Sequence, residues 1–151
     1  MIQRLAVLLG DESERKAIIE TYARRIGEIL YGNKGFWDKV LGKNPSIIKE
    51  LKYDANGYGV SYGNGTIAIS PSFITDPTGN YSVDKILDTV THETRHEYQS
   101  EVKKNPDKYA APDNLVKEWK QKYITSTVDY NKYYGQDVER DARAFAALSR
   151  P

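Results

Sequence analysis

The sequence lacks several features that would place the chain in a large functional class. It has no cysteine, which excludes disulfide bridges and metal sites built on thiolates. No hydrophobic run approaches the roughly 20 residues that cross a bilayer, and the apolar stretch at residues 5–9 is too short for a signal peptide. We therefore expect a soluble protein without a membrane partner, located in the cytoplasm or exported by a route that needs no signal peptide.

The sequence also lacks an excess of positive or negative charge. The chain has 22 Lys and Arg residues against 21 Asp and Glu residues, and its net charge is +1. Because nucleic-acid-binding domains carry a broad basic surface, we expect no nucleic-acid partner. The 151 residues suffice for a modest hydrophobic core, and we expect residues 1–151 to form a single domain.

Histidine is scarce, and its placement is the most informative feature of the sequence. Both histidines lie in the pentapeptide His92-Glu93-Thr94-Arg95-His96, which has the HExxH pattern. Side chains four residues apart lie on the same face of an α-helix, so both imidazoles can reach one metal ion. The glutamate after the first histidine turns toward the same cleft, where it can take a proton from a water molecule at the metal. The pattern therefore predicts a zinc hydrolase site, with Glu93 as the general base.

The sequence before the pentapeptide favours a helix. Ser82 is a good N-cap residue, and the segment that follows it carries apolar side chains at helical spacing, namely Val83, Ile86, Leu87 and Val90. At about 100° per residue, His92 and His96 point roughly 150° away from this apolar stripe. One face of the helix would pack on the core while the other lines a cleft.

A catalytic zinc ion takes three protein ligands, so a third ligand is needed. Because the chain has no cysteine, a carboxylate or a tyrosine must supply it. Glu139 is our candidate, with Asp141 as the alternative, because both lie in a second helical pattern at residues 138–148. The apolar side chains of that pattern are Ala142, Phe145, Ala146 and Leu148. The ordinary alternative is that Glu139 pairs with Arg143 on an exposed helix face.

Other polar residues could support such a site. Asp88 or Asp141 could accept a hydrogen bond from the second ring nitrogen of a coordinating histidine. A hydrogen-bond donor could stabilise the negative oxygen that forms when water attacks a carbonyl group. The candidates for this donor are Tyr130, Tyr133, Tyr134 and Arg143, although packing alone would also account for each tyrosine.

The rest of the chain predicts an α+β order of elements. Residues 12–31 have an amphipathic helical pattern, and the side chains expected to face inward are Ala17, Ile18, Tyr22, Ile26, Ile29 and Leu30. Residues 32–46 indicate a loop or a short helical connection. Residues 47–53, 58–62 and 66–69 indicate strands, and the dipeptide Asn64-Gly65 predicts a hairpin between the last two.

Two further expectations concern the cleft and the region after the pentapeptide. Residues 66–70 are our candidate for a sheet edge that pairs with an extended peptide, and a plain core strand is the alternative. A helix should begin at Asp113, and its inward side chains should be Leu115, Val116, Trp119 and Tyr123.

An HExxH helix followed by a separate helix that carries a glutamate resembles the gluzincin type of zinc metallopeptidase. The E-x-x-A-x-x-F-A segment that begins at Glu139, and the stretch at residues 66–71, look like the corresponding parts of the ImmA/IrrE peptidases. The chain is also similar to metallopeptidase modules of bacterial polymorphic toxins. The resemblance covers about residues 64–151, and Arg95 stands where ImmA-type sequences usually have glycine.

The resemblance implies a minimal zincin-like fold, in which a small mixed or antiparallel sheet packs on the HExxH helix and a C-terminal ligand helix. It also implies that His92, His96 and Glu139 bind zinc (Zn2+) and that Glu93 is the general base. We therefore expect a zinc-dependent metallopeptidase whose partner is a protein or peptide substrate. A zinc-bound interaction module without catalysis, and an effector or toxin protease with one target protein, are the alternatives. The sequence identifies neither the substrate nor any inhibitory partner.

Overall fold

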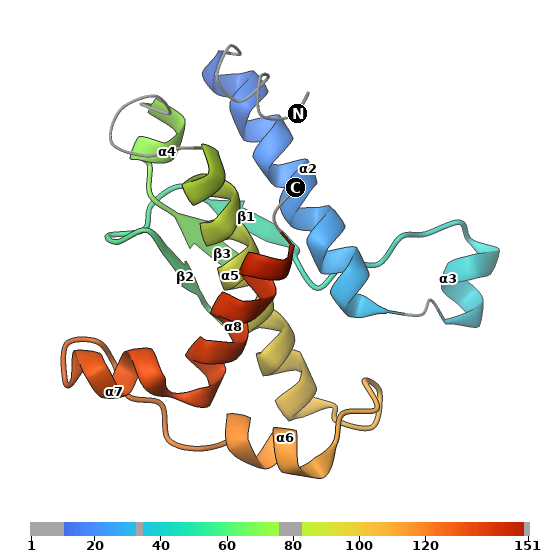
Figure 1. The fold of residues 1–151 in the computed structure, drawn as a ribbon. Helices are drawn as coiled ribbons and strands as arrows, with labels where there is room; N and C mark the ends of the chain where they lie inside the picture. Colours follow the sequence, from blue (N-terminus) through green and yellow to red (C-terminus); the bar gives the residue numbers. More distant parts are fainter. Residues whose placement is uncertain (1–10, 33–34, 76–82, 150–151) are drawn as a thin grey trace.

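The computed structural model has an α+β architecture and describes residues 11–32, 35–75 and 83–149 (Figure 1). The elements in these ranges are α2 (Glu12–Tyr31), α3 (Phe36–Val40), β1 (Glu50–Lys52), β2 (Gly59–Ser61), β3 (Thr66–Ile69), α4 (Ser72–Thr75), α5 (Val83–Lys104), α6 (Asp113–Trp119), α7 (Tyr130–Gly135) and α8 (Asp137–Leu148). The apolar stretch at residues 5–9 and the expected N-cap Ser82 lie outside the described residues. Within the described ranges, no helix is long and apolar enough to cross a membrane.

The three strands form a mixed sheet in the order β1-β3-β2. Strand β1 runs parallel to β3, and β2 runs antiparallel to it, with Val60 opposite Ala68. The expected mixed sheet is therefore confirmed, but the expectation that residues 66–70 form its edge is wrong. Ile67, Ala68 and Ile69 are completely buried, and strands pair with β3 on both sides. The alternative of a core strand is correct, because a short run of apolar residues suits a strand that is covered on both faces.

The predicted hairpin joins β2 to β3 through Gly63, Asn64 and Gly65. The backbone N–H of Tyr62 donates to the carbonyl oxygen of Thr66 at 3.1 Å, which closes the loop. Gly63 and Gly65 have φ angles of 76° and 92°, a backbone conformation that favours glycine. Glycine is thus required on both sides of Asn64 for the chain to turn here.

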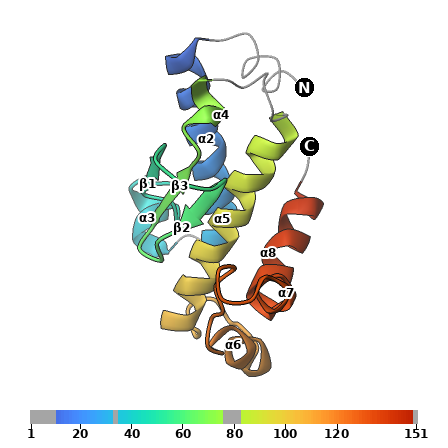
Figure 2. The ribbon, with the colours of Figure 1, turned by 90° about the vertical axis from the view of Figure 1, so that its left-hand side faces the viewer.

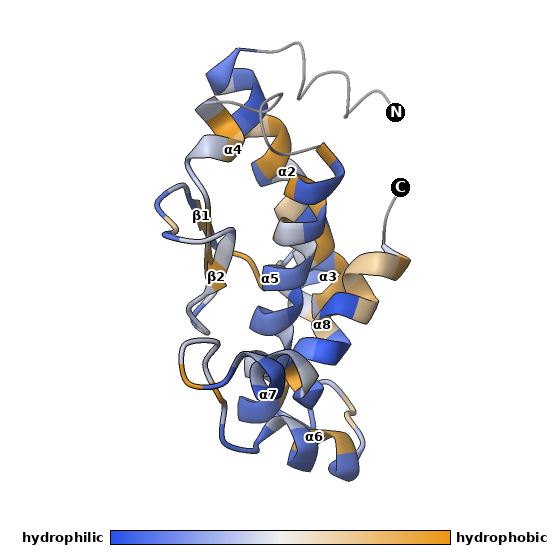
Figure 3. Cartoon of the chain, turned by 60° about the vertical axis from the view of Figure 1, so that its left-hand side comes forward, coloured by the Kyte–Doolittle hydropathy of each residue, from blue (hydrophilic) through white to orange (hydrophobic). Residues whose placement is uncertain are grey.

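Helix α5 is the central element, and it lies between the sheet on one side and α8 on the other (Figure 2). Its first turns complete the main core together with α2, the sheet and α4, through Val83, Ile86, Leu87 and Val90. Near its other end, Val102 packs with Val116 and Trp119 of α6 in a smaller apolar cluster. The expected apolar stripe is therefore confirmed, and the histidines lie on the part of α5 between the two clusters. Figure 3 shows that the part of the molecule formed by α6 and α7 is mostly hydrophilic.

The predicted bounds of the first described helix are confirmed, but part of its predicted inward face is wrong. Ile19 and Ala23 are completely buried, whereas Ile29 is 70% exposed and Ala17 is also exposed. The reason is a close backbone contact at Gly27, whose carbonyl oxygen accepts a hydrogen bond from the N–H of Ile47. A Cβ atom at Gly27 would lie 3.0 Å from the backbone nitrogen of Ile48. The chain that enters β1 therefore crosses the helix on the face that holds Ile19, Ala23 and Gly27.

Two expectations near the C-terminal half also need correction. Helix α6 does begin at Asp113, but it ends at Trp119, so Tyr123 lies in the connection to α7. In α8, Ala142 and Ala146 are buried, as expected for the face that packs on α5, whereas Leu148 is 87% exposed. Leu148 is the last residue of α8, beyond the buried positions of this face.

Glu97 attaches the hairpin to α5. Its side chain is completely buried, and it accepts hydrogen bonds from the Ser61 hydroxyl at 2.7 Å, the Gly63 N–H at 2.6 Å and the Gly65 N–H at 2.8 Å. Buried N–H groups need such an acceptor, because leaving them unpaired costs about 1–3 kcal/mol each. Glu97 therefore fixes the position of β2 beside the histidines.

We expect Glu97→Ala to lower the free energy of unfolding by about 3 kcal/mol, because it leaves the two glycine N–H groups without an acceptor. For a chain of this length the change corresponds to a fall in Tm of roughly 10 °C. Thermal unfolding followed by circular dichroism measures it. Glu118→Ala, a change of the same kind at an exposed position of α6, is the control and should alter stability by less than about 0.5 kcal/mol. Equal Tm values for the two variants would contradict the assigned role of Glu97.

Candidate metal centre

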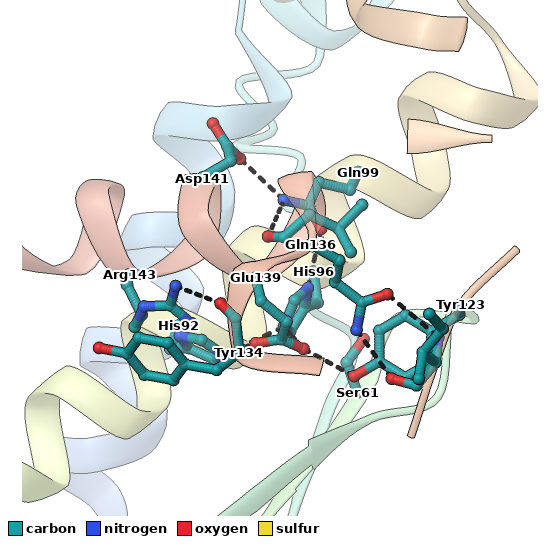
Figure 4. Close-up of polar contacts among 12 residues, drawn as sticks. Ser61, His92, His96, Gln99, Tyr123, Tyr134, Gln136, Glu139, Asp141 and Arg143 are labelled. Carbon is teal, nitrogen blue, oxygen red and sulfur yellow. Dashed lines mark hydrogen bonds and ion pairs between the residues drawn. The ribbon is translucent and has the colours of Figure 1, made fainter. Parts of the chain in front are cut away.

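The structure brings His92, His96 and Glu139 together, although α5 supplies the histidines and α8 supplies the glutamate (Figure 4). The Nε2 atoms of His92 and His96 are 3.0 Å apart. Glu139 Oε2 lies 3.1 Å from His92 Nε2, and Glu139 Oε1 lies 3.2 Å from His96 Nε2. The buried alanines of α8 are small enough for α8 to lie close to α5, and this packing brings the carboxylate within reach of the two imidazoles.

These separations fit a metal ion. Zinc binds nitrogen and oxygen at about 2.0–2.1 Å in a tetrahedral arrangement, so two of its ligand atoms lie about 3.3–3.4 Å apart. The three separations, which join the two Nε2 atoms to each other and to different oxygens of Glu139, are slightly shorter. One ligand atom from each residue lies within 4.8 Å of the others. Two imidazoles and a carboxylate are also a common donor set for zinc. The His92, His96 and Glu139 group can therefore hold a metal ion.

Gln99 determines which nitrogen of His96 is available to a metal. The Gln99 Nε2 group donates to the Val138 carbonyl oxygen at 2.9 Å and to Asp141 Oδ2 at 2.8 Å. The amide oxygen of Gln99 must then be the atom that lies 2.8 Å from His96 Nδ1. His96 Nδ1 therefore carries a proton, and Nε2 is the ring nitrogen left to bind a metal ion, which would displace any proton that Nε2 shares with Glu139.

Arg95 and Asp141 support this arrangement from the other side of Gln99. The Arg95 guanidinium donates to both Asp141 oxygens, at 2.7 and 3.0 Å, and so ties α5 to α8. It also lies over the rings of Tyr98 and Phe145, at 4.6 and 4.8 Å from their centroids. Asp141 thus contacts Arg95 and Gln99, so the alternative of Asp141 as third ligand, or as direct partner of a histidine, does not agree with the structure. The bond expected between Asp88 and His92 stays a prediction.

Tyr123 orients the third candidate ligand. Its hydroxyl donates to Glu139 Oε1 at 2.6 Å, which leaves Oε2 directed at His92. The loop that carries Tyr123 is held by Gln136, whose side-chain amide makes two hydrogen bonds to the backbone of Ile124, at 2.8 and 3.1 Å. Sequence patterns assigned Tyr123 to the inward face of the helix that begins at Asp113, and nothing in them linked it to Glu139, which lies 16 residues further along the chain. Gln99, in contrast, lies three residues after His96 and could have been found from helical spacing.

The electrostatics of the site favour positive charge where the three residues meet. Burial alone would raise the pKa of Glu139, but hydrogen bonds with His92 and His96 lower it well below its ordinary value. Burial alone would lower the pKa of His96, yet the hydrogen bond with Glu139 and the nearby Glu93 carboxylate raise it. A lowered pKa for a carboxylate and a raised pKa for an imidazole are both expected where the surroundings favour positive charge.

Glu93 lies beside this position and is covered by strand β2. It is 8% exposed, and burial raises its pKa above the ordinary value, although the two histidines partly offset this effect. A Cβ atom at Gly59 would lie 2.8 Å from Glu93 Cγ, so only glycine lets β2 come this close. Glu93, His96 and Glu139 line a cavity of about 330 Å³, together with Gly59, Val60 and Ser61 of β2.

The candidates for stabilising a negative oxygen occupy different places. Tyr133 lines the cavity, and burial followed by the charges of Glu139 and Glu93 raises its pKa to about 12. Arg143 lies instead over the ring of Tyr134, at 3.6 Å from its centroid, and donates to the Tyr134 carbonyl oxygen. Tyr130 is 62% exposed. Of the four candidates, only Tyr133 is among the residues that line the cavity.

Comparison of the chain with models of protein families, with curated proteins and with solved structures finds no match in any of the three. The interpretation of the site therefore depends on its own geometry.

Proposed function

We propose that this protein is a zinc-dependent metallopeptidase with a zincin-like fold. The observation that carries the proposal is the convergence of His92, His96 and Glu139, with Glu93 lining the same cavity as His96 and Glu139. An ion-binding site alone would not need a buried carboxylate that stays outside the ligand group. A hydrolase needs such a group to accept a proton from the attacking water.

Glu93 and Tyr133 have separate roles in the proposed reaction. A zinc ion, when bound, would polarise the substrate carbonyl group and lower the pKa of a nearby water molecule. The Glu93 carboxylate accepts the proton of the attacking water and later gives it to the leaving amine. Burial favours this exchange, because the raised pKa makes Glu93 a stronger base. Tyr133 lines the cavity, and its hydroxyl would donate to the oxygen on which negative charge develops.

Strand β2 is the element on which an extended peptide would lie. It is an edge strand of the described sheet, and all three of its residues line the cavity beside Glu93. A peptide that pairs with the free edge of β2 would bring its carbonyl groups past the metal position, and its backbone N–H and C=O groups would be satisfied by the strand. This role replaces the one expected for residues 66–70.

The proposal is tested first by metal content and then by turnover. We expect near-stoichiometric zinc in the purified protein by elemental analysis. We also expect cleavage of at least some members of a peptide mixture by mass spectrometry. Treatment with 1,10-phenanthroline should abolish the cleavage, and added zinc should restore it. A protein that takes up no metal from a zinc solution would contradict the proposal.

The two alternatives give different results in the same experiments. Stoichiometric zinc without cleavage of any peptide or protein would favour an interaction module without catalysis. An effector or toxin protease would cleave one target protein, and its expression would harm the cell unless Glu93 were changed to glutamine.

A further inference from the structure

The cavity extends from the metal position along α5, away from the sheet core. His96, Gln99, Ser100 and Lys103 all line it, and their spacing places them on one face of the helix. At 1.5 Å per residue, the Cα atoms of His96 and Lys103 are about 10 Å apart along the helix axis. The cavity therefore has a metal end and a lysine end.

Lys103 is the one cationic side chain among the residues that line this cavity. It is partly buried, and burial followed by the nearby Lys104 lowers the pKa of its ammonium group. No carboxylate in the described residues forms an ion pair with it. The acidic residues that line the cavity are Glu93 and Glu139, and both belong to the metal end. Among the described residues, the lysine end thus presents a positive charge without an anionic partner.

The walls at the lysine end suit a side chain of moderate length that ends in a polar group. Trp119 and Val138, which pack with Val102 next to Lys103, supply apolar surface. Ser100 and Gln121 are polar residues of the same cavity lining. Apolar walls exclude water, and an ion pair is stronger where water is excluded. Aliphatic carbons that carry a carboxylate would contact these walls and bring the carboxylate to the ammonium group.

We propose that Lys103 binds a carboxylate of the substrate close to the bond that is cleaved. The inference rests on the proposed peptidase function and adds the chemical class of its substrate. A lysine side chain spans about 6 Å, so its ammonium group can reach within one or two residues of a carbonyl group at the metal position, since an extended chain advances about 3.3 Å per residue. Both an acidic side chain and a free C-terminal carboxylate meet this requirement.

Binding of three peptide hydroxamates, whose hydroxamate group binds zinc, tests the inference without turnover. The first carries a Glu side chain and a C-terminal amide, the second carries Gln in its place, and the third is the Gln peptide with a free C-terminal carboxylate. With the zinc-loaded protein, we expect calorimetry to show that the first or the third binds at least about tenfold more tightly than the second. The tighter of the two identifies the source of the carboxylate.

Lys103→Gln should remove this preference while the affinity for the Gln peptide stays within about twofold, which shows that the metal end is intact. Lys117→Gln removes the same charge at an exposed position outside the cavity and should retain the preference. Lys103→Glu should instead prefer a fourth peptide that carries Lys. Equal affinities of the wild-type protein for the first three peptides, or binding of none of them, would overturn the inference. If the preference is found but no peptide is ever cleaved, the carboxylate site stands and the peptidase function fails.

Discussion

Glu139→Gln is expected to lower the zinc affinity of the protein by more than about 100-fold. Changes to residues that only orient a ligand typically cost 10–100-fold, and loss of a ligand should cost at least as much. Glutamine keeps the shape of the side chain, and its oxygen can still accept a hydrogen bond from Tyr123, but it removes the negative charge that faces the two imidazoles. Competition with a chelator of known affinity measures the change.

Glu139→Gln should also remove the stabilisation of the folded protein by added zinc. A ligand that binds only the folded chain stabilises it, so zinc at about 100 times its Kd should stabilise the wild-type protein by about 2.7 kcal/mol and raise Tm by roughly 5–10 °C if it binds as proposed. The variant should show almost no rise when zinc is added. Asp141→Asn tests the alternative ligand. Asp141 contacts Arg95 and Gln99 and not the metal position, so this variant should lose less zinc affinity than Glu139→Gln. Loss of zinc from Asp141→Asn but not from Glu139→Gln would show that the ligand has been misassigned.

Glu93→Gln is expected to keep zinc at full stoichiometry and to lower the rate of peptide hydrolysis by roughly 10²–10⁴-fold. That range is the usual contribution of a general base, which an amide cannot replace. The side chain is buried beside Gly59, where the equal size of glutamine avoids a clash. The measurement compares kcat/KM for any cleaved peptide with zinc content on the same preparation.

A control for Glu93→Gln is available on the same helix. Glu101→Gln makes the same chemical change at a residue that does not line the cavity, so kcat/KM should stay within about twofold. If Glu93→Gln cleaves every substrate as fast as the wild-type protein does, Glu93 is not the base. A variant that has lost zinc as well would instead assign Glu93 a part in metal binding.

Local patterns predicted much of this fold because they depend on neighbours in the sequence. Apolar residues at helical spacing correctly placed α5, α8 and the bounds of α2. The run Thr66–Ile69 and the dipeptide Asn64-Gly65 correctly placed β3 and its hairpin. The face that each element buries was predicted less well. Several apolar residues of α2 compete for the inward position, and the contact at Gly27 decides between them.

Long-range contacts also decided which strand is exposed and which side chains surround the metal position. A buried run of four residues does not reveal whether its strand is central or at an edge, and here β1 and β2 pair on both sides of β3. Tyr123 reaches Glu139 only because Gln136 holds its loop. Neither contact leaves a periodic signal in the sequence.

The sequence alone determined the donor groups: two histidines one helical turn apart, a glutamate beside the first, and no cysteine that could compete for a metal. It left Glu139 and Asp141 open as third ligand, because both lie near the start of the same helix. Only the tertiary structure decided between them. Residues two apart on a helix point about 200° apart, so packing of α8 on α5 through Ala142 and Ala146 turns one carboxylate toward the histidines and the other toward Arg95. That choice depends on how α8 packs on α5, and a local sequence pattern does not predict how two helices pack.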